Sequence, residues 1–175
     1  MSGTTIKLVF RILFLVIILY ITRFVIANKS ITRKDIQAEV IINSSASRVW
    51  QSLLDFKTYP QWNPFIRNMA GTASPGEKLK AKMHLGKLTM TLRPTVLVVE
   101  PERELRWIGR LYVQGLFDGE HSFIIEPLSE KQVRFIQREE FNGLLIPFFT
   151  SLLKDTRKSF NDMNRALKER AESSN

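Results

Sequence analysis

Alternating apolar and polar residues fill most of the chain between Gly71 and Phe141, and this pattern constrains the fold more than any other feature. In residues 78–85, KLKAKMHL, every second residue is a lysine or histidine and those between them are apolar. Successive side chains of a β-strand point to opposite faces, so such a segment places one face on a core and the other in water. Glycine and proline turns separate several such segments. The pattern predicts a six-strand antiparallel meander.

Three polar residues fall on the faces predicted to point inward. In residues 132–141, the apolar ends of the strand assign the inner face, and this face also carries Gln137 and Glu139. The strand before it places His121 on the inner face, together with Phe123 and Ile125, whereas His84 lies on the solvent-facing side of residues 78–85. Buried polar groups need hydrogen-bond partners. We therefore expect His121, Gln137 and Glu139 to form one inward polar cluster.

Along the chain, helices are expected both before and after the meander. A strand over residues 35–42 is followed by Ser44 and Ser45, which are able N-caps for a helix that ends before Pro60. A second short turn or helix is expected over residues 62–66. From about Pro147 the inward-facing residues recur at helical spacing: Phe149, Leu152, Leu153, Thr156, Phe160, Met163, Asn164 and Leu167. The element order predicts an α+β domain that ends in a long amphipathic helix.

The N-terminal segment is apolar and basic. Fifteen of the twenty residues from 8 to 27 are Leu, Ile, Val or Phe. At about 1.5 Å per residue they would span about 30 Å as a helix, which predicts a single-pass transmembrane anchor. Arg11 and Arg23 lie near its ends, where arginine can reach lipid headgroups. We therefore divide the chain into a membrane anchor with a basic flank, residues 1–34, and a ligand-binding domain, residues 35–175.

The location of the domain depends on how the apolar segment is used. More basic residues follow the apolar run than precede it, and this favours a cytoplasmic domain. The alternative is a signal peptide, with an apolar run from Ile12 to Thr22 and a cleavage-like Val25-x-Ala27 sequence, which would leave a secreted domain.

Charge and composition exclude several classes of function. Six basic and no acidic residues lie in residues 1–34, so the remaining 20 basic residues face 17 acidic ones, and the domain carries only +3 of the total +9. This near balance argues against nucleic-acid binding and favours a membrane partner for the N-terminal charges. The chain has no cysteine and two histidines, which leaves too few ligands for a zinc site. No metal or cofactor is expected.

Several stretches resemble the SRPBCC superfamily, which contains START lipid-transfer domains and polyketide cyclase and dehydratase relatives. They are NSSASRVWQSLLDFKTYPQWNPFI, PGEKLKAKMHL, EPERELRWIG, GLFDGEHSFIIEP and FNDMNRALKERA, within about residues 35–170. The most specific elements are Val49-Trp50, the segment from Asp55-Phe56 to Trp62-Asn63-Pro64, and Leu105-Arg106-Trp107. The resemblance implies a helix-grip fold, in which a curved antiparallel sheet wraps around the C-terminal helix and encloses an apolar cavity.

The side-chain alternation selects candidates to line the cavity that the resemblance implies. They are Met83, Met90, Leu92, Trp107, His121, Phe123, Phe135, Gln137, Glu139 and Phe141 from the sheet, with Phe149, Phe160 and Met163 from the helix.

The favoured function is a membrane-anchored module that binds or transports a hydrophobic small molecule or lipid, with the inward polar cluster orienting its polar end. The alternatives are an enzyme of the polyketide cyclase/dehydratase type, with His121 and Glu139 moving protons, and a purely structural module. Binding is favoured over catalysis because an inward histidine and glutamate more often satisfy each other, the backbone or water.

Overall fold

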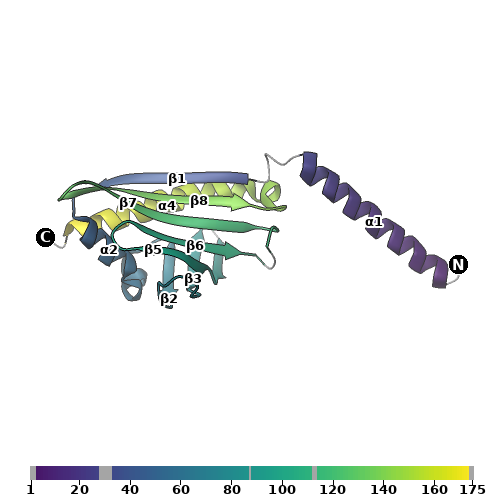
Figure 1. Ribbon diagram of the computed structural model, residues 1–175, viewed down its shortest axis with the longest axis horizontal. Helices are drawn as coiled ribbons and strands as arrows, with labels where there is room; N and C mark the ends of the chain where they lie inside the picture. Colours follow the sequence, from purple (N-terminus) through teal and green to yellow (C-terminus); the bar gives the residue numbers. More distant parts are fainter. Residues whose placement is uncertain (1–2, 28–32, 87, 112–113, 174–175) are drawn as a thin grey trace.

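The computed structural model describes residues 3–27, 33–86, 88–111 and 114–173 (Figure 1). Helix α1 (Gly3–Ala27) precedes an α+β body. The strands of the body are β1 (Arg33–Ile42), β2 (Ile66–Ala70), β3 (Lys80–Leu85), β4 (Leu88–Leu92), β5 (Thr95–Glu100), β6 (Glu104–Arg110), β7 (Asp118–Ser129) and β8 (Gln132–Asn142). Its helices are α2 (Ala46–Leu54), the 3-10 helix η1 (Phe56–Thr58), α3 (Tyr59–Trp62), the 3-10 helix η2 (Ile146–Phe149) and α4 (Thr150–Ser173).

The antiparallel strands of the body form two sheets, and both sheets contribute residues to one buried core. Within the described residues, one sheet has the order β1-β8-β7-β6-β5 and the other has the order β2-β3-β4. A bridge between Lys78 and Thr95 links the two. Helix α4 contacts β1, β3, β8 and α2, and Figure 1 shows it running along β1 and β8. A curved sheet with a long C-terminal helix on its inner side confirms the predicted α+β helix-grip fold.

The predicted inner faces of the strands are confirmed by burial. Along β3, Ala81, Met83 and Leu85 are buried, whereas Lys80 and Lys82 are exposed. On β7 and β8 the buried faces carry His121 and Gln137, as the alternation predicts. Helix α2 also begins where expected, because the side chain of its N-cap residue Ser45 accepts a hydrogen bond from the Arg48 backbone N–H at 3.3 Å.

The chain after α3 differs from the sequence prediction. Residues 66–70 form strand β2, not the end of a short helix, so the described part of the chain has seven strands after α3, where the sequence predicted six. The Asn63 side-chain oxygen accepts hydrogen bonds from the backbone N–H groups of Phe65 and Ile66, at 3.0 and 2.8 Å. This side-chain turn ends α3 and directs the chain into β2.

The alternation along the sequence also predicts that Leu88 and Val98 point inward, and both of these assignments are wrong. The pairing register shifts between Val96 and Val98, so Val98 lies opposite Arg106, and Val99 packs against the core in its place. This β-bulge inserts one residue and reverses the alternation after it. Leu88, also predicted to be inward, is 47% exposed next to the β3–β4 turn.

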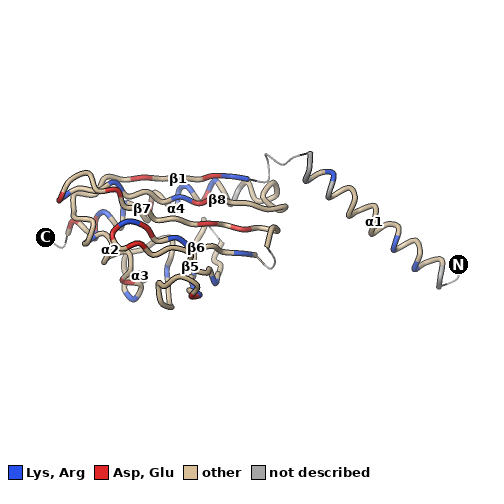
Figure 2. Tube along the Cα trace, in the orientation of Figure 1, with Lys and Arg blue, Asp and Glu red and all other residues tan. Residues whose placement is uncertain are grey.

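Helix α1 forms, but its predicted role as a transmembrane anchor is not supported. Among the described residues, no helix is long and apolar enough to cross a membrane. Helix α1 carries basic residues and no acidic ones, whereas the body carries both signs (Figure 2). The predicted domain boundary, location and signal-peptide alternative stay predictions.

Tyr59 couples the stability of the body to alkaline pH. Its ring is fully buried and its hydroxyl donates a hydrogen bond to the Leu53 carbonyl at 2.6 Å. Burial, and secondarily the nearby Asp55 carboxylate, raise the pKa of Tyr59 well above its ordinary value. The folded chain therefore keeps the proton at a pH where the unfolded chain releases it. The contribution of Tyr59 to the free energy of unfolding is therefore complete below the ordinary tyrosine pKa of about 10, and it falls as the pH rises above that value.

We expect the Tyr59 contribution to fall by about 1.4 kcal/mol for each pH unit above about 10. Tyr59→Phe should be less stable than the parent at neutral pH by about 1 kcal/mol, because it loses one hydrogen bond. The difference should shrink and then reverse as the pH rises. Urea unfolding of both chains across the alkaline range measures this, and a constant difference would contradict the linkage.

Candidate functional site

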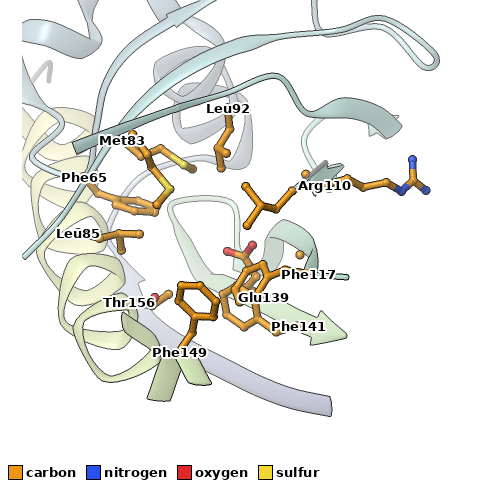
Figure 3. Close-up of a pocket in the computed structure, with 14 residues that line it drawn as sticks. Phe65, Met83, Leu85, Leu92, Arg110, Phe117, Glu139, Phe141, Phe149 and Thr156 are labelled. Atoms are coloured by element: carbon orange, nitrogen blue, oxygen red, sulfur yellow. The ribbon is translucent and has the colours of Figure 1, made fainter. Parts of the chain in front are cut away.

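A cavity of about 100 Å³ lies between the two sheets and the start of α4 (Figure 3). The strands of both sheets and the segment that enters α4 contribute its walls. The lining residues are Phe65, Met83, Leu85, Met90, Leu92, Gly109, Arg110, Leu111, Phe117, Gly119, Glu139, Phe141, Phe149 and Thr156. Apolar side chains dominate this set, and Glu139 is its one acidic member. Such a surface favours apolar molecules.

The cavity has a closed inner end and a more exposed rim. Phe65 and Met83 are buried at the inner end. At the rim, Phe117 packs against Phe141 and Phe149, with ring centroids 5.5 and 5.2 Å apart. Phe117 and Phe149 are only half-buried. Phe117 and Phe149 are therefore two of the partly exposed residues that bound the cavity.

The volume limits what the cavity holds in this conformation. Ligand pockets for drug-sized molecules enclose about 300–1,000 Å³, and an apolar cavity of about 150 Å³ binds benzene. At about 100 Å³, the cavity suits a molecule of about one ring. A longer chain requires the rim rings to move.

Glu139, His121 and Gln137 form the polar cluster that the sequence predicts. The Glu139 Oε2 atom lies 2.8 Å from His121 Nδ1, and Gln137 Nε2 lies 3.0 Å from His121 Nε2. With the Gln137 amide N–H donating to Nε2, the imidazole donates from Nδ1 to the carboxylate. Gln137 Oε1 is buried and has no hydrogen-bond partner among the described residues. The cluster is a chain of hydrogen bonds that ends at the Glu139 carboxylate.

Packed aromatic rings hold His121 in place. Its ring centroid lies 5.2 Å from that of Trp107, 4.4 Å from that of Phe123 and 4.9 Å from that of Phe160. The His121 side chain is 1% exposed, whereas that of Glu139 is 14% exposed. Of the three cluster residues, only Glu139 lines the cavity. Figure 3 shows its carboxylate directed toward the middle of the labelled residues. The site can therefore offer a ligand one carboxylate acceptor in an apolar wall.

The structure separates the predicted lining residues into two groups. Those that line the cavity are Met83, Met90, Leu92, Glu139, Phe141 and Phe149. Those that do not are Trp107, His121, Phe123, Phe135, Gln137, Phe160 and Met163, which are buried in the packed core. In that region aromatic rings from both sides touch, for example Trp107 and Phe123 at 4.9 Å, and fill the space. Whether the lining residues bind a ligand stays a prediction.

Sequence reasoning missed other lining residues, and some of them had a signal. Leu85 lies on a predicted inner face but was not selected. Gly109 and Gly119 lie opposite each other on β6 and β7, and glycine inside a strand often marks a close approach of neighbouring groups. Among the described residues, no group of three or more histidines and acidic residues could hold a metal ion.

Comparison with solved structures identifies the fold. The chain is similar to the ZhuI aromatase/cyclase from Streptomyces sp. R1128, with a TM-score of 0.66, 12% sequence identity, and coverage of 80% of this chain and 94% of that one. A START superfamily protein from Mycobacterium smegmatis gives 0.63, 18%, 81% and 99% in the same order. Norcoclaurine synthase from Thalictrum flavum, in complex with dopamine and hydroxybenzaldehyde, gives 0.62, 14%, 82% and 88%.

Comparison of the sequence with protein families covers nearly the whole body. No curated protein matches the chain. A family model described as polyketide cyclase / dehydrase and lipid transport matches residues 33–172, and this agrees with the SRPBCC resemblance and with the helix-grip fold. The chain therefore belongs to the polyketide cyclase / dehydrase and lipid transport family, within the START-like helix-grip superfamily.

Proposed function

We propose that this protein binds a hydrophobic small molecule in the cavity between its sheets and α4. The observation that carries the proposal is the wall, which is apolar from Phe65 and Met83 at the inner end to Phe149 at the rim. The wall contains one carboxylate, that of Glu139, and its other polar residues are Arg110 and Thr156. Such a wall is typical of sites in which apolar contacts supply affinity and a few polar groups set orientation.

The expected affinity follows from the size of the cavity. Burying an apolar group contributes about 0.8 kcal/mol for each CH₂ equivalent. An aromatic ring with one methyl group, which has about seven carbons in total, therefore contributes about 5–6 kcal/mol. This corresponds to a dissociation constant of about 0.1 mM. The protein is therefore expected to bind single-ring aromatic compounds weakly, and to bind larger ligands more tightly where the rim opens.

The similar structures support a ring-shaped ligand. The Thalictrum flavum norcoclaurine synthase structure holds dopamine and hydroxybenzaldehyde, each of which has one aromatic ring. We propose a binding role in preference to a catalytic one. His121, the natural proton carrier of the polar cluster, is 1% exposed and enclosed by aromatic rings. Of the three residues of this cluster, a ligand in the cavity therefore contacts only Glu139.

Titration of the full chain with para-fluorotoluene, followed by fluorine NMR, tests the proposal. We expect saturable binding near 0.1 mM. Met90→Trp should weaken it at least about tenfold, because the larger side chain at a lining position of β4 occupies the cavity. Leu88→Trp is the matched control, since Leu88 lies on the same strand but is exposed and outside the lining.

Two results would contradict the proposed function. One is the absence of saturable para-fluorotoluene binding by the parent chain. The other is binding that Met90→Trp and Leu88→Trp weaken equally, since this would place the probe outside the cavity. Thermal unfolding of both variants checks that each retains the fold.

A further inference from the structure

Gly119 leaves the space that the Glu139 carboxylate fills. Gly119 lies on β7, opposite Gly109 of β6 and Phe141 of β8. A Cβ atom built on Gly119 would overlap Glu139 Oε1 and would lie 3.4 Å from Glu139 Cδ. Its φ angle lies outside the left-handed region, so an alanine here is free of backbone strain. A side chain at this position would therefore act on the carboxylate of Glu139.

The two oxygens of Glu139 have different surroundings. Oε2 accepts the hydrogen bond from His121 Nδ1 at 2.8 Å. Oε1 lies against Gly119 and has no hydrogen-bond partner among the described residues. Because Glu139 and Gly119 both line the cavity, Oε1 is an acceptor beside the ligand space. A carboxylate oxygen has lone pairs for further donors, so Oε1 can accept one from a ligand.

The apolar wall restricts which donor this oxygen can receive. An ammonium group carries three N–H donors, and burying those left without acceptors is costly. A hydroxyl group carries a single donor, which Oε1 can satisfy. The site therefore fits an aromatic or similarly compact apolar body that carries one hydroxyl.

We propose that Gly119 is a positioning residue, which seats the Glu139 carboxylate so that Oε1 accepts a hydrogen bond from the hydroxyl of a ring-sized, phenol-like ligand. This inference rests on the proposed function, because it specifies the ligand class of the same cavity. A hydrogen bond to a charged acceptor is among the stronger ones in proteins. It should therefore appear as a measurable preference between two probes of the same shape.

The test compares para-fluorophenol with para-fluorotoluene, which differ in a hydroxyl against a methyl group, by fluorine NMR titration of the full chain. The parent should prefer the phenol about tenfold. Gly119→Ala should reduce the preference to within about twofold, because the added methyl group displaces the Glu139 carboxylate. Gly109→Ala is the matched control. Its added Cβ lies 3.9 Å from its nearest neighbours, so it should affect both probes equally and preserve the preference.

A denaturation cycle separates positioning from a general effect on the strand. Gly119→Ala should lower the urea midpoint in the parent, where the methyl group displaces the carboxylate. It should change the midpoint little in a Glu139→Met background, where the carboxylate is absent. An equal loss in both backgrounds would overturn the inference, and the double variant keeps the test decisive if the single variant fails to fold.

The outcomes distinguish this inference from the proposed function. If neither probe binds the parent, the proposed function is wrong. If para-fluorotoluene binds but the phenol shows no preference, or the preference survives in Gly119→Ala, binding stands and the positioning role of Gly119 is wrong.

Discussion

Phe160→Ala is expected to lower the free energy of unfolding by about 3–5 kcal/mol, the range for removing a fully buried phenylalanine. The Phe160 side chain is fully buried on α4, and its ring centroid lies 5.5 Å from that of Phe65 and 4.9 Å from that of His121. The substitution leaves a void between α4 and the sheet. Urea unfolding followed by circular dichroism measures the change.

Phe148→Ala is the matched control for this prediction. Phe148 lies two residues before α4 and is 73% exposed, so its removal should change the free energy of unfolding by less than about 0.5 kcal/mol. The sequence predicted Phe160 as a cavity wall, whereas the structure places it in the packed core. A loss of ligand binding in Phe160→Ala with unchanged stability would contradict the structural placement.

His121→Phe is expected to lower the free energy of unfolding by about 2–4 kcal/mol. The new ring keeps the contacts with Trp107 and Phe123, but Glu139 and Gln137 lose the imidazole. Gln137 Nε2 then keeps only its weak hydrogen bond to Met163 Sδ at 3.6 Å. Each buried polar group left unpaired costs about 1–3 kcal/mol. Adding Glu139→Leu should recover part of the loss, because it removes one of the two unpaired groups.

The other histidine provides the control for this cycle. His84 lies on the wet face of β3, and its Nδ1 is 3.4 Å from the Thr89 hydroxyl. His84→Phe should therefore change stability by less than about 0.5 kcal/mol. The account of the polar cluster is wrong if both histidine variants lose the same stability, or if Glu139→Leu makes His121→Phe still less stable.

Much of the fold could be predicted because it depends on local patterns. A period of two residues fixes the faces of a strand, so the sequence correctly placed Met83, His121 and Gln137 inward. The polar cluster could also be predicted from this period. His121 and Glu139 lie opposite each other in the β7–β8 pairing, which brings two inward faces together.

The rest depends on distances that no local pattern contains. The bulge between Val96 and Val98 and the turn at Asn63 each depend on a few local contacts. The bulge changes which residues of β5 face the core, and the turn leads into the additional strand β2. The cavity wall depends on how closely α4 approaches the sheet, and Phe160 of α4 contacts His121 of β7. The role proposed for Gly119 could not be predicted either, because its proximity to the Glu139 carboxylate is visible only in the folded sheet.

A crystal structure of the full chain soaked with para-bromophenol tests the central claim most directly, because anomalous scattering locates the bromine without assumptions about the pose. We predict one bromine site in the cavity bounded by Met83, Phe141 and Phe149, with the phenol oxygen about 2.5–3.0 Å from Glu139 Oε1. Bromine sites only outside the cavity, at concentrations that saturate the NMR titration, would contradict the claim that the cavity binds a hydrophobic small molecule.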